Sequence, residues 1–170
     1  METFPPDLDS TQDPAAVTAC QPYCLSLERV DQQPVGGKAA GLASLLRLGL
    51  PVPEAFVIVH ASAEQFPEEL EQYYLALGGG PVAVRSSATG EDGSSASFAG
   101  QFDTLLNVQG VGALREAVTS CVASLHSAWA DAYTRDQLAS GDPESVSAAP
   151  AMSVLVQQMV SPRCAGVLFT

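Results

Sequence analysis

Two positively charged side chains stand next to small residues in a way that suits anion binding. Lys38, the only lysine in the chain, follows Gly36 and Gly37. A glycine turn leaves backbone N–H groups available, and the start of a helix adds the positive end of its dipole. Such a turn is able to hold a phosphate, with the ammonium as a point charge. The spacing is not that of the phosphate-binding loop, and a helix cap with a solvated lysine explains the same residues.

The second cation is Arg85, which follows a short apolar run and precedes Ser86 and Ser87. A guanidinium at the end of a strand, with two hydroxyl groups donating beside it, suits bidentate recognition of a phosphate. An ion pair with Glu91 or Asp92 is the structural alternative. The sequence alone leaves both readings of Arg85 open.

A long segment of small residues follows this arginine. Residues 86–102 read SSATGEDGSSASFAGQF and show no helical or strand period. Loops longer than about 12–15 residues are usually functional or disordered. The segment is therefore interpreted either as a glycine-rich lid that folds over a nucleotide and excludes water, or as a disordered surface loop.

A third segment, residues 157–160 with the sequence QQMV, lies at the end of an apolar run. Its backbone groups and apolar side chains are able to face an adenine ring. An ordinary core strand explains the same pattern, so this segment is a weaker candidate than the two cations.

Helices and strands in a regular order are expected to position these residues. The leucines after Lys38 recur at helical spacing, with Gly49 as the stop and Pro51 just beyond. A helix from Ser62 to about Leu77, interrupted or restarted at Pro67, is predicted next. A helix is also expected from Gly112 to about Leu138. Strands are predicted at residues 55–59, 82–84, 103–108 and 152–160, and another begins at 165–169.

Composition and charge limit the classes of protein that fit. The chain has 170 residues and is 46% hydrophobic, which excludes a wholly disordered protein and suggests one domain or part of one. No run approaches the roughly 20 apolar residues that a membrane helix needs. Nineteen acidic residues against seven basic ones give a net charge of −12, which disfavours nucleic-acid binding.

The two ends of the chain carry separate expectations. Residues 1–24 are predicted to be a flexible, acidic, proline-rich leader, and residues 25–170 the folded domain. The first residues lack the basic start and apolar stretch of a signal peptide, so the cytoplasm is the expected compartment. Free thiols rather than a metal site are expected for the four cysteines, Cys20, Cys24, Cys121 and Cys164.

Three blocks in this order and spacing resemble a known family. They are VGGKAAGLASLLRLGLPVPEAFVI, VAVRSSATGEDGSSASFAGQFDTLLNV and VLVQQMVSPRCAGVLFT. They are similar to the N-terminal, nucleotide-binding domain of phosphoenolpyruvate synthases, pyruvate phosphate dikinases and rifampicin phosphotransferases. The resemblance covers residues 35–170, and the Ser-Ser-Ala-Thr form is closer to the synthase and rifampicin branches.

The resemblance implies an α/β fold, namely the first part of an ATP-grasp domain with a mixed sheet and packed helices. It also implies ATP and Mg²⁺ as cofactors. The β-phosphate would pass to a histidine on a separate, swivelling domain and then to an acceptor such as pyruvate. The positions that match the family's ATP-binding residues are Lys38, Arg85, Ser86, Gly100, Gln101, Thr104, Gln157, Met159 and Val160.

Parts of the family pattern are missing from these 170 residues. The second half of the ATP-grasp domain, with its magnesium ligands, the phosphohistidine domain and the acceptor domain have no counterpart here. We therefore expect no catalytic residue and no metal ligand in this chain, and no ATP turnover by the chain alone. The alternative is a non-catalytic nucleotide-binding or interaction module, whose unpaired sheet edge would join a partner strand.

Overall fold

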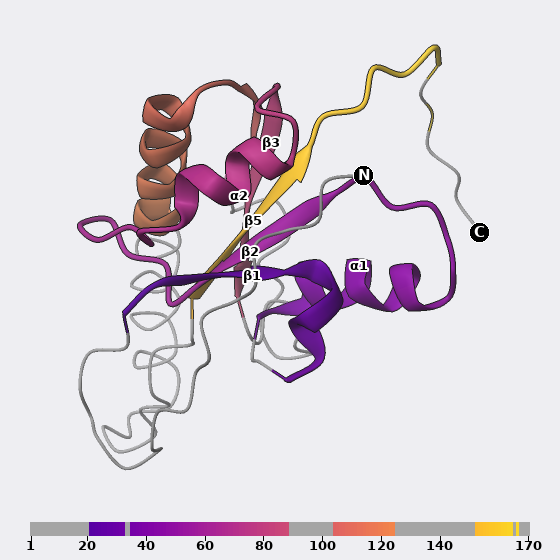
Figure 1. The fold of residues 1–170 in the computed structure, drawn as a ribbon, viewed down its shortest axis with the longest axis horizontal. Coiled ribbons are helices and arrows are strands. Elements are labelled where there is room, and N and C mark those ends of the chain that lie inside the picture. Colours follow the sequence, from indigo (N-terminus) through magenta and orange to yellow (C-terminus); the bar gives the residue numbers. More distant parts are fainter. Residues whose placement is uncertain (1–20, 33–34, 89–103, 125–151, 165, 167–170) are drawn as a thin grey trace, which may run out of the picture.

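A computed structural model describes residues 21–32, 35–88, 104–124, 152–164 and 166. The strands are β1 (Tyr23–Ser26), β2 (Ala55–Val59), β3 (Val82–Ala88), β4 (Thr104–Val108) and β5 (Met152–Gln158). They form one five-stranded sheet in the spatial order β1-β2-β5-β3-β4 (Figure 1). β5, the last of these strands along the chain, therefore lies in the middle of the sheet.

All the neighbouring strands of this sheet are antiparallel. β2 and β3 run in the same direction, but β5 lies between them, runs the opposite way and pairs with both. The expected α/β class is confirmed. The expected mixture of parallel and antiparallel pairs is not found among the described strands, because β5 separates the two strands that would pair in parallel.

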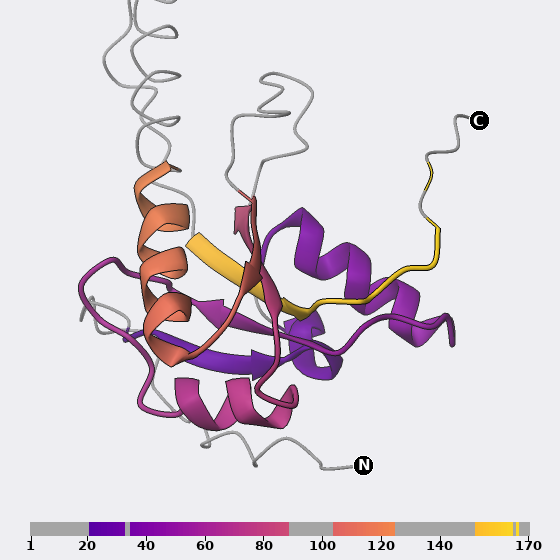
Figure 2. The same cartoon turned by 90° about the horizontal axis from the view of Figure 1, so that it is seen from above.

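Helices cover both faces of the sheet. On one face lie the 3-10 helix η1 (Leu27–Gln32) and α1 (Gly37–Arg47). On the other lie α2 (Leu70–Ala76) and a helix described over residues 111–124. Figure 1 shows α1 below the strands and α2 above them, and Figure 2 shows the same separation from a second direction. The described residues thus form three layers.

Each face of the sheet has its own hydrophobic core. Phe56 and Ile58 of β2 belong to the cluster on the α2 face, whereas Val57 and Val59 belong to the cluster on the α1 face. All five residues of β2 are buried. A strand covered on both faces reads as a continuous apolar run, and this explains why residues 55–59 were predictable as a strand.

The helix after Lys38 is confirmed. Ala39 and Ala43 of α1 are buried against the sheet. Gly49 has a φ of 73°, and its N–H donates to the carbonyl of Leu46 at 2.9 Å. A left-handed residue directly after a helix is the usual C-terminal stop, and glycine adopts it without steric cost.

The next predicted helix is shorter than expected. Instead of running from Ser62, α2 spans Leu70–Ala76. The N–H of Leu70 donates to the carbonyl of Pro67 at 3.2 Å, so the helical turns start after this proline. Proline lacks an N–H and cannot occupy a helix interior without breaking the ladder, which is the physical reason for the difference.

The remaining expectations are met in part or fall outside the described residues. β1 begins at Tyr23, within the range predicted as leader, and pairs with β2. The helix predicted from Gly112 is present over residues 111–124. Residues 1–20, the predicted end of that helix and almost all of the strand predicted at 165–169 lie outside the description. Within it, no helix has the length and apolar character needed to cross a membrane.

Candidate nucleotide-phosphate site

Arg85 lies in a row of residues that crosses the sheet on its α1 face. Arg85 pairs directly with Thr104 of β4 on one side and with Leu155 of β5 on the other. Directly paired residues in an antiparallel sheet point to the same face. Leu155 belongs to the core cluster under α1, so the side chains of Arg85 and Thr104 face the α1 side as well.

The guanidinium is only partly covered by its surroundings. Arg85 is half-buried, and within the described part of the chain its Nε is buried without a hydrogen-bond partner. An unpaired buried donor costs about 1–3 kcal/mol. Arg85 thus has an N–H that an anion would satisfy, while the remainder of the side chain keeps contact with solvent.

The expectation that Arg85 ends its strand is wrong. β3 continues to Ala88, because its pairing with β5 extends as far as the pair of Ala88 with Met152. Arg85 is therefore an interior residue of β3, fixed by a strand on each side. A side chain on a paired strand is held more firmly than one in a terminal loop.

Ser87 connects this strand to the start of α1. Ser87 follows Arg85 by two residues and lies on the same face, because side chains alternate along a strand. Its Oγ donates to the carbonyl of Val35 at 2.7 Å and accepts from the N–H of Ala39 at 3.2 Å. Lys38 directly precedes Ala39. The structure therefore brings the Lys38 turn and the Arg85 strand together on one side of the sheet.

The start of α1 suits an anion. Gly36 is the N-cap residue, with a φ of 80°, and it makes no side-chain hydrogen bond to the helix. The first turn contains no acidic residue. The positive end of the helix dipole is therefore not neutralised by a carboxylate of that turn. Lys38, half-buried in the same turn, adds a full positive charge.

Ser86 lies apart from the two cations. It pairs with Val154, whose side chain belongs to the cluster on the α2 face. Ser86 is 1% exposed, and among the described residues its Oγ has no partner. The structure thus places Ser87, rather than Ser86, on the face that Arg85 occupies. The residue pattern alone predicted both serines as donors beside Arg85, and the family resemblance carried over only Ser86, although alternation along a strand separates the two.

Two of the predicted loop residues cannot be located. Gly100 and Gln101 lie outside the described residues. Thr104, the next candidate, is exposed at the start of β4 and faces Arg85 across the strand pair.

The predicted adenine segment lies where β5 leaves the sheet. Gln157 is half-buried on the α1 face, since it pairs with Ala83 and Ala55, and its Nε2 donates to the carbonyl of Pro53 at 3.4 Å. Gln157 therefore shares a face with Arg85. Val160 is 58% exposed, which leaves its apolar side chain open for contact.

Two backbone donors of this segment are already used. The N–H of Gln158 donates to the carbonyl of Glu54 at 2.8 Å, and that of Met159 to the carbonyl of Pro81 at 3.0 Å. A purine edge at this position would have to use other polar groups of the segment. The side chains of Met159 and Val160, half-buried and exposed, remain available for apolar contact.

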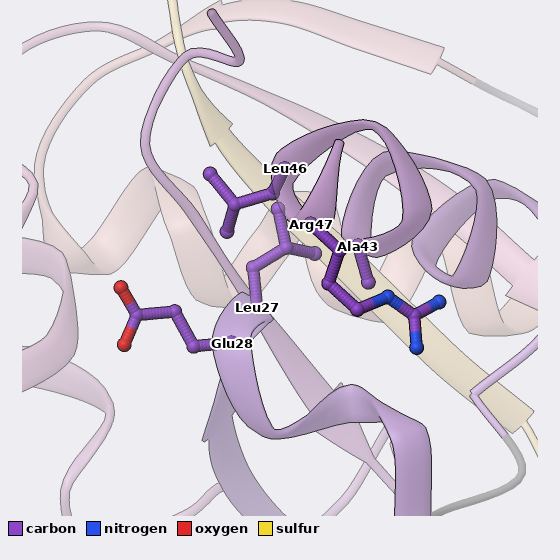
Figure 3. Close-up of a pocket in the computed structure, with 5 residues that line it drawn as sticks. All are labelled: Leu27, Glu28, Ala43, Leu46 and Arg47. Atoms are coloured by element: carbon purple, nitrogen blue, oxygen red, sulfur yellow. The ribbon is translucent and has the colours of Figure 1, made fainter. Parts of the chain in front are cut away.

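A cavity of about 320 Å³ lies elsewhere, between η1 and α1 (Figure 3). Leu27, Ala43 and Leu46 form an apolar floor, while the charged groups of Glu28 and Arg47 point to opposite sides. Neither Lys38 nor Arg85 lines it. The cavity uses the C-terminal half of α1, so it is separate from the helix start that carries Lys38.

Cysteines and acidic residues form no metal site in the described part of the chain. No group of three or more His, Cys, Asp or Glu residues is placed there to hold an ion. Cys24 and Cys121 are buried, whereas Cys164 is exposed. Cys20 lies outside the description.

The strand that carries Arg85 lies within a family-level similarity. Residues 64–170 match the family described as pyruvate phosphate dikinase, AMP/ATP-binding domain. The match spans more than half of the chain and includes Arg85 with its strand. The chain therefore belongs to this family of nucleotide-binding domains, as the sequence blocks predicted.

Curated relatives extend the similarity to named phosphotransferases. The chain is 36% identical to a phosphoenolpyruvate synthase of Aeropyrum pernix, over 80% of the chain and 22% of the relative. It is 36% identical to a prodigiosin synthesizing transferase of Serratia marcescens, over 80% of the chain and 18% of the relative. It is 34% identical to a rifampicin phosphotransferase of Streptomyces sviceus, over 87% of the chain and 22% of the relative. The chain thus spans about a fifth of the length of these relatives.

Proposed function

We propose that this chain supplies part of the ATP-binding site of a phosphotransferase related to the phosphoenolpyruvate synthases. In this proposal the domain is of the ATP-grasp type, and a phosphoryl group passes from ATP to a histidine on a separate domain and then to an acceptor such as pyruvate. The proposed setting is the cytoplasm. Lys38 and Arg85 bind the phosphates.

The main support is the arrangement around Arg85. Its buried Nε has no partner among the described residues, and the strand that carries it is hydrogen-bonded through Ser87 to the turn of Lys38. With a net charge of −12, the chain repels a polyanion at long range. Two cations beside a helix start provide the local attraction that a triphosphate needs.

The chemistry of phosphoryl transfer gives each cation a role. Such reactions depend mostly on positioning and on neutralising the charge of the transferred group. The guanidinium of Arg85 binds phosphate oxygens through its fork of N–H donors, and the ammonium of Lys38 acts as a mobile point charge. Both residues hold the phosphates and do not themselves form bonds to the reacting atom.

The other residues carried over from the family complete the proposed site. Ser86, Gly100, Gln101 and Thr104 belong to the strand and loop near the phosphates. Gln157, Met159 and Val160 border the adenine. Gln157 and Thr104 share the face of Arg85, which supports their inclusion. Ser86 faces the opposite side, so any role it has is through the packing of β3.

Magnesium fits this proposal only together with the nucleotide. If bound there, Mg²⁺ would offset part of the charge of the phosphates. The described residues offer cations for the phosphates but no cluster of carboxylates for the metal. We therefore assign the metal ligands to parts of the protein outside the described residues.

The test measures MgATP binding by calorimetry. The protein used, called the longer protein below, joins this chain to the segments that follow the matching region in its relatives. Arg85→Ala should weaken binding by about 1–3 kcal/mol, the value of a charge-assisted contact. Arg115→Ala is the matched control, because Arg115 is exposed on the opposite helix layer and lies 5.6 Å over the ring of Phe66. Equal affinity in the wild type and Arg85→Ala would refute the role of Arg85.

A further inference from the structure

We propose that Ser87 is a positioning residue that holds the Lys38 turn against the Arg85 strand, so that both cations meet the same phosphate chain. This inference rests on the proposed function. It assigns a role to a residue that is absent from the predicted site, and it explains how two cations 47 residues apart in the sequence keep a fixed relation.

Ser87 spans the whole glycine turn with one hydroxyl group. Its Oγ donates its proton to the carbonyl of Val35, just before the turn, and accepts the N–H of Ala39, just after Lys38. The side chain is completely buried. The hydroxyl therefore clamps both ends of the segment Gly36–Lys38.

The bond to Ala39 also replaces a missing helix cap. A capping side chain normally accepts the N–H of the second or third helical residue. Gly36 has no side chain to do so, and Ala39 is the third residue of α1. Ser87 accepts this N–H from a neighbouring strand, 48 residues away in sequence. The start of α1 is thus stabilised only when it is docked on β3.

The position of Ser87 relative to Arg85 gives the clamp its functional consequence. Two residues along a strand correspond to about 7 Å. The strand that carries the guanidinium therefore carries the clamp as well, on the same face. Without the clamp, the start of α1 would keep the bond from the N–H of Ala40 to the carbonyl of Gly36 but would lose its bonds to β3, so Lys38 would be held less firmly relative to Arg85.

Ser153 offers a matched comparison within the same sheet. It pairs directly with Ser87 across β3 and β5 and is equally buried, at 0% exposure. Among the described residues, however, its Oγ has no hydrogen-bond partner. Ser87→Ala and Ser153→Ala each remove one buried oxygen atom. Only Ser87→Ala also removes hydrogen bonds to the segment that carries Lys38.

The experiment measures MgATP affinity by calorimetry in the longer protein, for the wild type, Ser87→Ala and Ser153→Ala. Circular dichroism first establishes that each variant is folded at the temperature used. Loss of a buried hydrogen bond predicts about 3–10-fold weaker binding for Ser87→Ala. Ser153→Ala should stay within about twofold of the wild type, because it breaks no bond to the turn.

A double-mutant cycle with Lys38→Ala separates positioning from general stability. In Lys38→Ala the ammonium no longer contributes to MgATP affinity, so displacing its turn has little further effect on binding. Ser87→Ala should therefore weaken binding clearly less in that background than in the wild type. Equal costs in both backgrounds would show that Ser87 does not act through Lys38. Should Ser87→Ala fail to fold, Ser87→Cys takes its place in the same cycle, since a thiol retains only weak hydrogen bonding.

The possible failures are distinguishable. If the folded wild type and Ser87→Ala bind MgATP equally well, the positioning role is refuted while the proposed function stands. If the wild type binds no MgATP, the proposed function itself is refuted, and the positioning role with it.

Discussion

Thr104, the first residue of β4, lies directly opposite Arg85 in the β3–β4 pair. The pair places the side chains of both residues on the face that α1 covers. Because the register fixes both backbones, the guanidinium of Arg85 has a restricted range of positions. A restricted donor loses less entropy when it binds an anion.

Arg85→Lys tests whether charge alone is sufficient at this position. Lysine keeps one positive charge but has no donor at the place of the buried Nε. We expect MgATP binding in the longer protein to weaken by about 1–2 kcal/mol, less than for Arg85→Ala. Calorimetry measures both variants, and full wild-type affinity in Arg85→Lys would show that the fork of donors is not used.

The 170-residue chain by itself is expected to release no phosphate from ATP. Phosphoryl transfer would need metal ions in place, and we proposed that their ligands lie in parts of the protein outside the described residues. A phosphate-release assay on the pure chain with MgATP measures this directly. Release that disappears in Lys38→Ala would contradict the expectation and assign catalysis to this chain.

Two glycines of the α1 region should respond to alanine in opposite directions. Gly41 lies inside α1 and Gly49 just after it, and at both a Cβ would meet no atom within 4 Å. Gly41→Ala should stabilise the chain by about 0.5–1 kcal/mol, because glycine loses more entropy in a helix. Gly49→Ala should lower the free energy of unfolding by about 1–2 kcal/mol, because Gly49 has a φ of 73°.

Urea denaturation of the chain measures both glycine variants, with each serving as the other's control. Neither change removes or adds a contact, so the difference reports the backbone conformation alone. Equal effects of the two substitutions would mean that Gly49 does not hold the left-handed conformation that stops α1.

Tyr74→Phe tests a hydrogen-bonded junction on the α2 side. The hydroxyl of Tyr74 donates to the carbonyl of Gly79 at 2.8 Å and accepts the N–H of Gly110 at 2.8 Å. It therefore joins the end of α2 to the start of the 111–124 helix. Phenylalanine keeps the ring packing but leaves these groups unpaired, at an expected cost of about 1–3 kcal/mol in the free energy of unfolding.

The same denaturation experiment checks the tyrosine variant. Its MgATP affinity in the longer protein should remain unchanged, because the junction lies on the face opposite to Arg85. A stability equal to that of the wild type would show that solvent replaces the lost hydroxyl.

Local patterns were sufficient for much of the fold. Residues 55–59 were predictable as a strand because both faces are buried, and α1 because its leucines and Gly49 mark its course and end. For α2 the sequence left two starting points open, at Ser62 or as a restart at Pro67. Its apolar pattern extends toward Ser62, but Pro67 limits where the helical ladder can start.

The candidate cations, too, were recognisable from residue type and neighbours. A lysine after two glycines and an arginine before two serines are local signals, and the family blocks around them identified the class of domain. The local sequence did not determine which of the two serines lies on the same face of the sheet as Arg85. That depends on where β3 begins and ends, which its partners β4 and β5 determine.

The amino-acid order alone thus determined the kind of domain and most of its helices and strands, and it singled out Lys38 and Arg85 as candidate cations. Only the tertiary structure decided that β5 inserts between β2 and β3, that Arg85 is interior to its strand, and that Ser87 caps α1. The physical reason is distance along the chain. Propensity and periodicity act between near neighbours, whereas strand insertion and the Ser87 bonds join segments about 50 to 100 residues apart.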